Sequence, residues 1–203
     1  MQRQSNHEKF KEIVEKFVEL KNTSELMIDL AYSALLLSSK ELAEEVYKLE
    51  EYIDKLHTQY ELAVLLSNFK EEEAKGILGL IRLGVVTEEI ADAAAEIAEV
   101  VLREIEPHPI MKLVIEEADE TATYVSVSED SPLVNKTLRE ARVTEETGMQ
   151  VLAIKRGDRY IRPRPDITIN AGDVIIASGY AEGEENLKKL ASPSLLGEAS
   201  RAE

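Results

Sequence analysis

The chain has 203 residues, a formal net charge of −16 at pH 7 and 44% hydrophobic residues. Such acidity excludes non-specific nucleic-acid binding and disfavours attraction to anionic lipid, while the lack of cysteine excludes disulfides, thiolate metal sites and cysteine catalysis. The length suits one large domain or two small ones with a real core. The N-terminus is polar and has no signal-peptide pattern, so we expect a cytoplasmic protein.

Helical periodicity dominates the first half of the chain, which has no proline before Pro107. Apolar residues at i+3 and i+4 spacing predict helices over Phe10–Ser38, Lys40–Phe69 and Lys70–Glu104. Long helices with short connections predict an antiparallel three-helix bundle over residues 1–107. Ser24 is a possible cap that would interrupt the first helix, and Thr87 a possible fresh helix start in the third.

The longest apolar run is Leu26–Leu37, which is too short to span a bilayer and contains Asp29. We therefore expect a buried helix segment and no direct membrane insertion. An unpaired charge inside such a run would cost several kcal/mol, so Asp29 should face a cation, a hydrogen-bond donor or the rim of the bundle.

Period-two alternation, glycine turns and short helical stretches follow one another in the second half of the chain. We expect residues 108–119 to connect the halves through a short helix over Ile110–Asp119, and residues 192–203 to form a flexible tail. The expected elements between them are a strand over Thr121–Val127, a helix over Lys136–Glu145 closed by Thr147-Gly148, a strand over Gln150–Arg156 with a hairpin turn into Arg159–Arg162, a strand over Val174–Ser178 and a helix over Gly183–Leu190.

Each expected long helix carries a glutamate followed four residues later by an aspartate. Residues at this spacing lie on one helix face, so each pair can present two carboxylates to one hard or borderline cation such as Mg²⁺, Mn²⁺ or iron. The alternative is that chance produces such pairs on acidic, solvated faces. The candidate metal ligands are Glu25, Asp29, Glu50, Asp54, Glu88 and Asp92.

Five basic residues fall within ten positions of this acidic chain, from Lys155 to Arg164. One interpretation is that the arginines pair with nearby acids on a strand edge, where charges also block aggregation. The other is an anion site for a nucleotide or phosphate, because the planar guanidinium suits phosphate. Its candidate ligand-binding residues are Arg156, Arg159, Arg162 and Arg164.

No catalytic constellation is recognisable. The three histidines, His7, His57 and His108, fall in a tail, a helix and a linker, and no phosphate-binding glycine loop follows a strand. We therefore expect a protein that is not an enzyme and has no catalytic residues.

Several motifs of the second half occur together in one known family. They are Ser131-Pro132-Leu133-Val134, Lys136-Thr137-Leu138, the apolar strand Val151–Ile154, Arg156, Pro165, and Gly172-Asp173 before a hydrophobic strand. Through them, Thr121–Leu190 resembles the TrkA-C domain, the C-terminal lobe of the regulators of potassium conductance (RCK). The resemblance implies a small α/β domain over residues 120–191 that dimerises and binds a regulatory ligand, in some relatives a cyclic dinucleotide.

The helical half looks like one half of a PhoU protein, a three-helix unit. The similarity rests on Lys48–Tyr60, on Ile81–Glu99 and on the Glu–Asp pairs, which match the acid motif that binds multinuclear metal in some PhoU proteins. PhoU usually carries two such bundles, so here a complete metal cluster would require a dimer.

Together these features predict an α plus α/β chain, with a PhoU-like bundle followed by a TrkA-C-like domain. We expect a homodimeric regulatory subunit that associates with a membrane cation transporter or channel and binds no nucleic acid. The family resemblance implies that the transported cation is potassium. Alternatives are a phosphate-signalling adaptor of the PhoU type and a carboxylate-site metal-binding protein. A divalent or iron ion and an anionic nucleotide are the candidate ligands.

Overall fold

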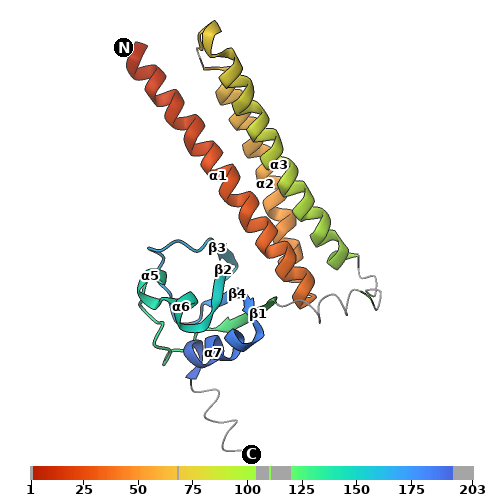
Figure 1. Ribbon diagram of the computed structural model, residues 1–203, viewed down its shortest axis with the longest axis vertical. Helices are drawn as coiled ribbons and strands as arrows, with labels where there is room; N and C mark the ends of the chain where they lie inside the picture. The colour runs from red at the N-terminus through yellow and green to blue at the C-terminus, as the bar shows by residue number, and fades with distance from the viewer. Residues whose placement is uncertain (1, 68, 104–109, 111–119, 194–203) are drawn as a thin grey trace, which may run out of the picture. The chain divides into compact units, whose positions relative to one another are not determined.

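The computed structural model describes residues 2–67, 69–103, 110 and 120–193, and the chain divides into two compact units, residues 1–105 and 106–203. Apart from Ile110, the expected connecting helix over Ile110–Asp119 lies outside the described residues, as does most of the expected tail. Figure 1 shows the first unit as long helices and the second as a small sheet with short helices.

The first unit is the predicted three-helix bundle. It comprises α1 (Gln2–Leu37), α2 (Lys40–Leu65) and α3 (Ala74–Leu102), with a short 3₁₀ turn over Glu71–Glu73 before α3. Each helix packs against the other two. The turn between α1 and α2 is stabilised by Ser39, whose hydroxyl accepts a hydrogen bond from the Leu42 backbone N–H at 3.3 Å and so caps α2.

Both expected helix breaks are wrong, because the two hydroxyl groups bond within continuous helices. The Ser24 hydroxyl donates to the Leu20 carbonyl at 3.0 Å and to the Thr87 carbonyl at 3.1 Å, which joins α1 to α3. The Thr87 hydroxyl donates to the Leu83 carbonyl at 2.7 Å. A mid-helix Ser or Thr that bonds the carbonyl four residues back leaves the helix intact.

The core of the bundle combines large side chains of α1 and α2 with small ones of α3. Fully buried residues include Leu20, Met27 and Tyr60, whereas α3 buries Ala91 and Ala98. Small residues let neighbouring helices approach closely, so α3 packs tightly against both other helices.

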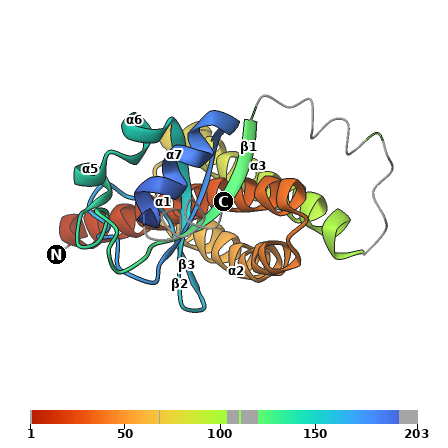
Figure 2. The same cartoon turned by 90° about the horizontal axis from the view of Figure 1, so that it is seen from below.

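The second unit is a four-stranded antiparallel sheet with strand order β1-β4-β2-β3. Its strands are β1 (Glu120–Ser126), β2 (Met149–Arg156), β3 (Arg159–Ile161) and β4 (Val174–Tyr180). The central strands β2 and β4 are the most apolar, with Ile154 opposite Ile175. The helix α7 (Ala181–Ala191) packs on β1, β4 and β2, as can be followed in Figure 2.

The single helix expected over Lys136–Glu145 is instead two short helices, α5 (Leu138–Ala141) and α6 (Val143–Thr147). They are separated by Arg142, which adopts the left-handed conformation with φ of 45° and cannot continue a right-handed helix. The expected end at Gly148 is present, with φ of 75°.

Candidate functional site

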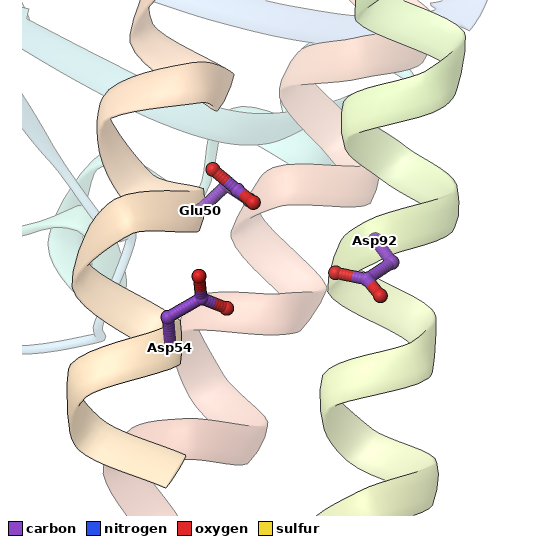
Figure 3. A group of neighbouring side chains, drawn as sticks. All are labelled: Glu50, Asp54 and Asp92. Carbon is purple, nitrogen blue, oxygen red and sulfur yellow. The ribbon is translucent and has the colours of Figure 1, made fainter. Parts of the chain in front are cut away.

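Three carboxylates meet at the surface of the bundle. Glu50 and Asp54 on α2 and Asp92 on α3 each offer an oxygen, and these ligand atoms all lie within 4.8 Å of one another. Figure 3 shows the α2 pair stacked one turn apart, with Asp92 reaching toward it from the neighbouring helix. We call Glu50, Asp54 and Asp92 the acid cluster.

The electrostatics of the acid cluster disfavour three full negative charges without a cation. Burial, followed by the charges of Asp54 and Asp92, raises the pKa of Glu50 above its ordinary value. Burial and then the Asp92 charge also raise the pKa of the adjacent Glu88, with His57 opposing the shift. A bound cation would remove this repulsion, and the all-oxygen ligand set fits a hard or borderline metal.

The remaining predicted metal ligands are not brought into this group. Glu25 forms an ion pair with Lys21 at 2.5 Å on α1. Asp29 is half-buried on the same helix, and its backbone carbonyl accepts a hydrogen bond from the Ser33 hydroxyl. Glu88 interacts electrostatically with the acid cluster but lies outside the close group.

His57, which the sequence places in the second helix, lies one turn beyond Asp54 on α2. Its side chain is 15% exposed, and its Nε2 lies 3.6 Å from Glu61. Within the described part of the chain that nitrogen makes no hydrogen bond. Its position three residues after Asp54 places it on nearly the same face of α2, where it interacts electrostatically with Glu88.

The second unit has a shallow groove of about 410 Å³. Its walls are α5 and α6, the beginning of β2 and the segment of residues 163–165. The Arg139 backbone N–H donates to the Pro165 carbonyl at 3.1 Å, which holds two of these walls together. Three arginines, Arg139, Arg142 and Arg164, line the groove against a single carboxylate, Glu145. We call it the arginine groove.

Arg142 occupies a strained position in the arginine groove. A left-handed backbone costs an L-residue about 1–2 kcal/mol relative to glycine, and no glycine stands here. The side chain is 62% exposed, and its Nε lies 3.8 Å from Glu145. Arg142 is also the C-cap of α5, and its backbone N–H donates to the Leu138 carbonyl at 3.2 Å.

Comparison with known families covers both units. Residues 17–101 match the family model of the PhoU domain, and residues 122–192 match that of the TrkA-C domain. The chain joins a PhoU domain to a TrkA-C domain. Both resemblances expected from the sequence are thereby confirmed, together with the fold of each part.

Two curated relatives from Methanocaldococcus jannaschii carry potassium-channel names. The chain is 42% identical over 82 residues to potassium channel protein 1 and 40% identical over 65 residues to probable potassium channel protein 2. These alignments cover 39% and 32% of this chain, but only 24% and 18% of the relatives. The chain thus spans about a quarter or less of the length of either protein.

A solved structure, the RCK_C domain dimer of S. agalactiae BusR in complex with c-di-AMP, is 29% identical to the chain. The match covers 36% of this chain and 96% of the BusR domain chain, with a TM-score of 0.34. A TM-score this low does not extend the likeness beyond what the family models establish.

The four predicted arginines occupy different environments in the TrkA-C domain. The Arg156 guanidinium holds the buried Asp173 with two hydrogen bonds, at 2.8 and 2.7 Å, and donates to the Thr168 carbonyl at 2.7 Å. Arg159 is exposed and Arg162 half-buried on the other side of the β2–β3 hairpin turn. Of the four, Arg164 alone lines the arginine groove, 3.8 Å from Asp166.

Sequence reasoning missed Arg139 and Arg142, the other two arginines of the groove. The spacing of three residues between them is visible in the sequence. The sequence predicts one continuous helix through Arg142, however, and so gives no indication of its left-handed backbone.

None of the helices in the described residues is long and apolar enough to cross a membrane.

Proposed function

We propose that this protein is a non-enzymatic regulator of potassium transport, in which the TrkA-C domain binds an anionic nucleotide in the arginine groove. The observation that carries the proposal is the groove itself, which three arginines line in an otherwise acidic chain. Guanidinium groups bind phosphate oxygens through paired, charge-assisted hydrogen bonds. The volume of about 410 Å³ is within the range of small-molecule sites.

The names of the curated relatives support the potassium part of the proposal. Two proteins about 40% identical to part of this chain are named potassium channel proteins. We propose a homodimer whose partner is a membrane cation transporter or channel, and whose ligand occupancy changes the activity of that partner. The arginine groove supplies the sensing, and the PhoU domain supplies a long helical surface for assembly.

Calorimetry on the full-length protein tests ligand binding. Cyclic di-AMP is the probe, with AMP and inorganic phosphate as smaller anions that share its chemistry. We expect saturable binding of cyclic di-AMP that weakens at least tenfold when Arg139 and Arg142 are both replaced by glutamine, because each lost charge-assisted hydrogen bond costs about 1.5–3 kcal/mol.

The matched control is Arg103→Gln, which removes one positive charge from the exposed end of the PhoU domain. Binding should be unchanged in this variant. If the Arg139→Gln/Arg142→Gln protein bound cyclic di-AMP as tightly as the wild type, the arginine groove would not be the binding site. If inorganic phosphate bound as tightly as cyclic di-AMP, the site would recognise a simple anion and not a nucleotide.

The acid cluster supports a second function, binding of a divalent or iron ion by the PhoU domain. The specific observation is that three carboxylates from two helices converge within 4.8 Å while burial and mutual repulsion raise the pKa of Glu50. Mn²⁺ should therefore raise the melting temperature of the chelator-treated protein, and Asp92→Asn should abolish the rise. Glu44→Gln, an exposed change elsewhere on α2, should leave it intact.

A further inference from the structure

The outward face of α3 carries an apolar stripe that the bundle does not cover. Leu83, Val86, Ile90 and Val100 are 51%, 53%, 41% and 53% exposed. With Ala93 and Ile97 they repeat every three and four residues, the spacing of the seam in a two-stranded coiled coil. Buried residues of α3 such as Ala91 and Ala98 lie on a different face, so the stripe is not needed for the core.

Two glycines continue the stripe toward the start of α3. Gly76 and Gly79 are exposed, and a Cβ on either would meet no atom within 4 Å. Each costs the helix about 1 kcal/mol relative to alanine, and the described bundle offers no steric reason for either. Glycines on a helix surface permit close approach of another helix, so both observations indicate a missing neighbour.

A row of charges beside the stripe indicates what that neighbour is. Lys75, Arg82, Glu89 and Glu96 recur every seven residues along one edge, with the two bases first and the two acids after them. None of the four forms an ion pair within the described part of the chain. When two copies of this helix run antiparallel, the two bases of each copy therefore lie beside the two acids of the other.

We propose that α3 of one chain packs antiparallel against α3 of a second copy along this stripe. In the register that fits, Arg82 lies beside Glu89 of the second copy and Lys75 beside Glu96 of the second copy. The same register sets Leu83 opposite Val86, and Gly79 opposite Ile90. The glycine thus accommodates the largest exposed β-branched side chain of the stripe.

Other arrangements use these features less well. In a parallel pair every residue lies level with its own copy, so the two bases approach bases and the acids approach acids. An anionic lipid surface would meet Glu89 and Glu96 beside the apolar stripe, in a chain of net charge −16. A second copy matches both the charge order and the glycine positions.

Spin labels measure the register directly, because the chain has no cysteine and single cysteines can be introduced freely. We would label full-length Leu78→Cys and Glu99→Cys proteins, positions on α3 away from the stripe, and measure label separations by pulsed electron resonance. With a rise of 1.5 Å per residue, the antiparallel register separates the two Leu78 positions by roughly 20 Å along the axis and the two Glu99 positions by roughly 43 Å.

A parallel pair would instead give two similar short separations, which overturns the proposal. So would the absence of any coupling between labels, which would mean that two α3 helices do not meet and that the stripe serves another partner. The labels report α3 alone, so dimerisation through the TrkA-C domain cannot substitute for the expected pattern.

Charge exchange provides an independent test by sedimentation. Arg82→Glu and Glu89→Arg should each weaken dimerisation about tenfold, because attraction becomes repulsion at two symmetric pairs. The combined variant should restore it, since residues seven apart on one helix are too distant to pair with each other. Lys11→Glu, the same charge change on exposed α1, is the control, and failure of the combined variant to recover overturns the register.

Discussion

Tyr60 of α2 lies directly against Gly84 of α3. A Cβ on Gly84 would lie 2.6 Å from the Tyr60 Cε1 atom, closer than such contacts occur. The buried Tyr60 hydroxyl also donates to the Leu80 carbonyl at 2.8 Å, one turn earlier on α3. This contact sets the spacing of the two helices whose carboxylates form the acid cluster.

Gly84→Ala should therefore destabilise the PhoU domain, although alanine is the better helix former. Forcing a methyl group against a packed ring costs about 1–3 kcal/mol. The gain in helix propensity is about 1 kcal/mol, so the net effect should be a loss of stability. Urea unfolding measures the difference. Measured on dissociated single chains, Gly76→Ala, which adds the same methyl group where the bundle leaves open space, should stabilise the fold by up to about 1 kcal/mol. Equal gains in both variants would contradict the account.

Arg142→Gly should separate stability from ligand binding. Glycine relieves the left-handed strain, so the TrkA-C domain should gain about 1 kcal/mol while binding of cyclic di-AMP weakens. Ser38→Gly changes another residue with positive φ, 49°, at the end of α1 and far along the chain from the groove. It should be stabilising without altering binding. A loss of stability in Arg142→Gly would show that the arginine has a structural role.

Asp173→Asn should destabilise the TrkA-C domain by roughly 2–4 kcal/mol. Asp173 is 1% exposed, receives both Arg156 hydrogen bonds and also accepts from the Asn170 backbone N–H at 2.8 Å. Removing its charge leaves a partly buried guanidinium with a weaker partner. Asp166→Asn removes the same charge from an exposed pair with Arg164 and should change stability by less than about 1 kcal/mol. Thermal unfolding compares the two.

The acid cluster should make the metal-free protein less stable as pH rises. Because the folded-state pKa values of Glu50 and Glu88 are raised, the folded state binds more protons than the unfolded state in the range just above the ordinary carboxyl value of 4.5. Stability contributed by these groups is thus present at lower pH and is lost as pH rises through their folded-state pKa values.

Glu50→Gln should accordingly stabilise the chelator-treated protein at pH 7, by less than about 1 kcal/mol, and flatten its dependence on pH. Chemical unfolding at pH 5 and pH 7 provides the comparison, with Glu44→Gln as control. A destabilised Glu50→Gln protein at pH 7 would mean that the ionised carboxylate has a partner that the account omits.

Local patterns were sufficient to predict most elements. The 3.6-residue periodicity predicted α1, α2 and α3, and the Gly157-Asp158 turn predicted the β2–β3 hairpin. Errors arose where tertiary contacts override local signals. Ser24 resembles a cap in the sequence, but in the fold its hydroxyl bonds two carbonyls, one of them on α3.

The candidate sites were only partly predictable for a related reason. Spacing along a helix identifies carboxylates that share a face, yet it does not say which faces of different helices meet, so Asp92 joins the α2 pair while Glu25 does not. In the basic run, no local pattern marks Arg156 as the partner of Asp173, seventeen residues later. The backbone of Arg142 has no sequence signal, because left-handed positions usually hold glycine.

Potassium uptake tests the central claim most directly. Rubidium, as a tracer for potassium, would be followed in cells that lack this protein and in cells that carry wild type, Arg139→Gln/Arg142→Gln or Arg103→Gln. The account predicts altered uptake in the deletion, restored by wild type and by Arg103→Gln but not by the groove variant. Uptake that is unchanged by deletion, or that the groove variant restores fully, would contradict regulation of potassium transport through the arginine groove.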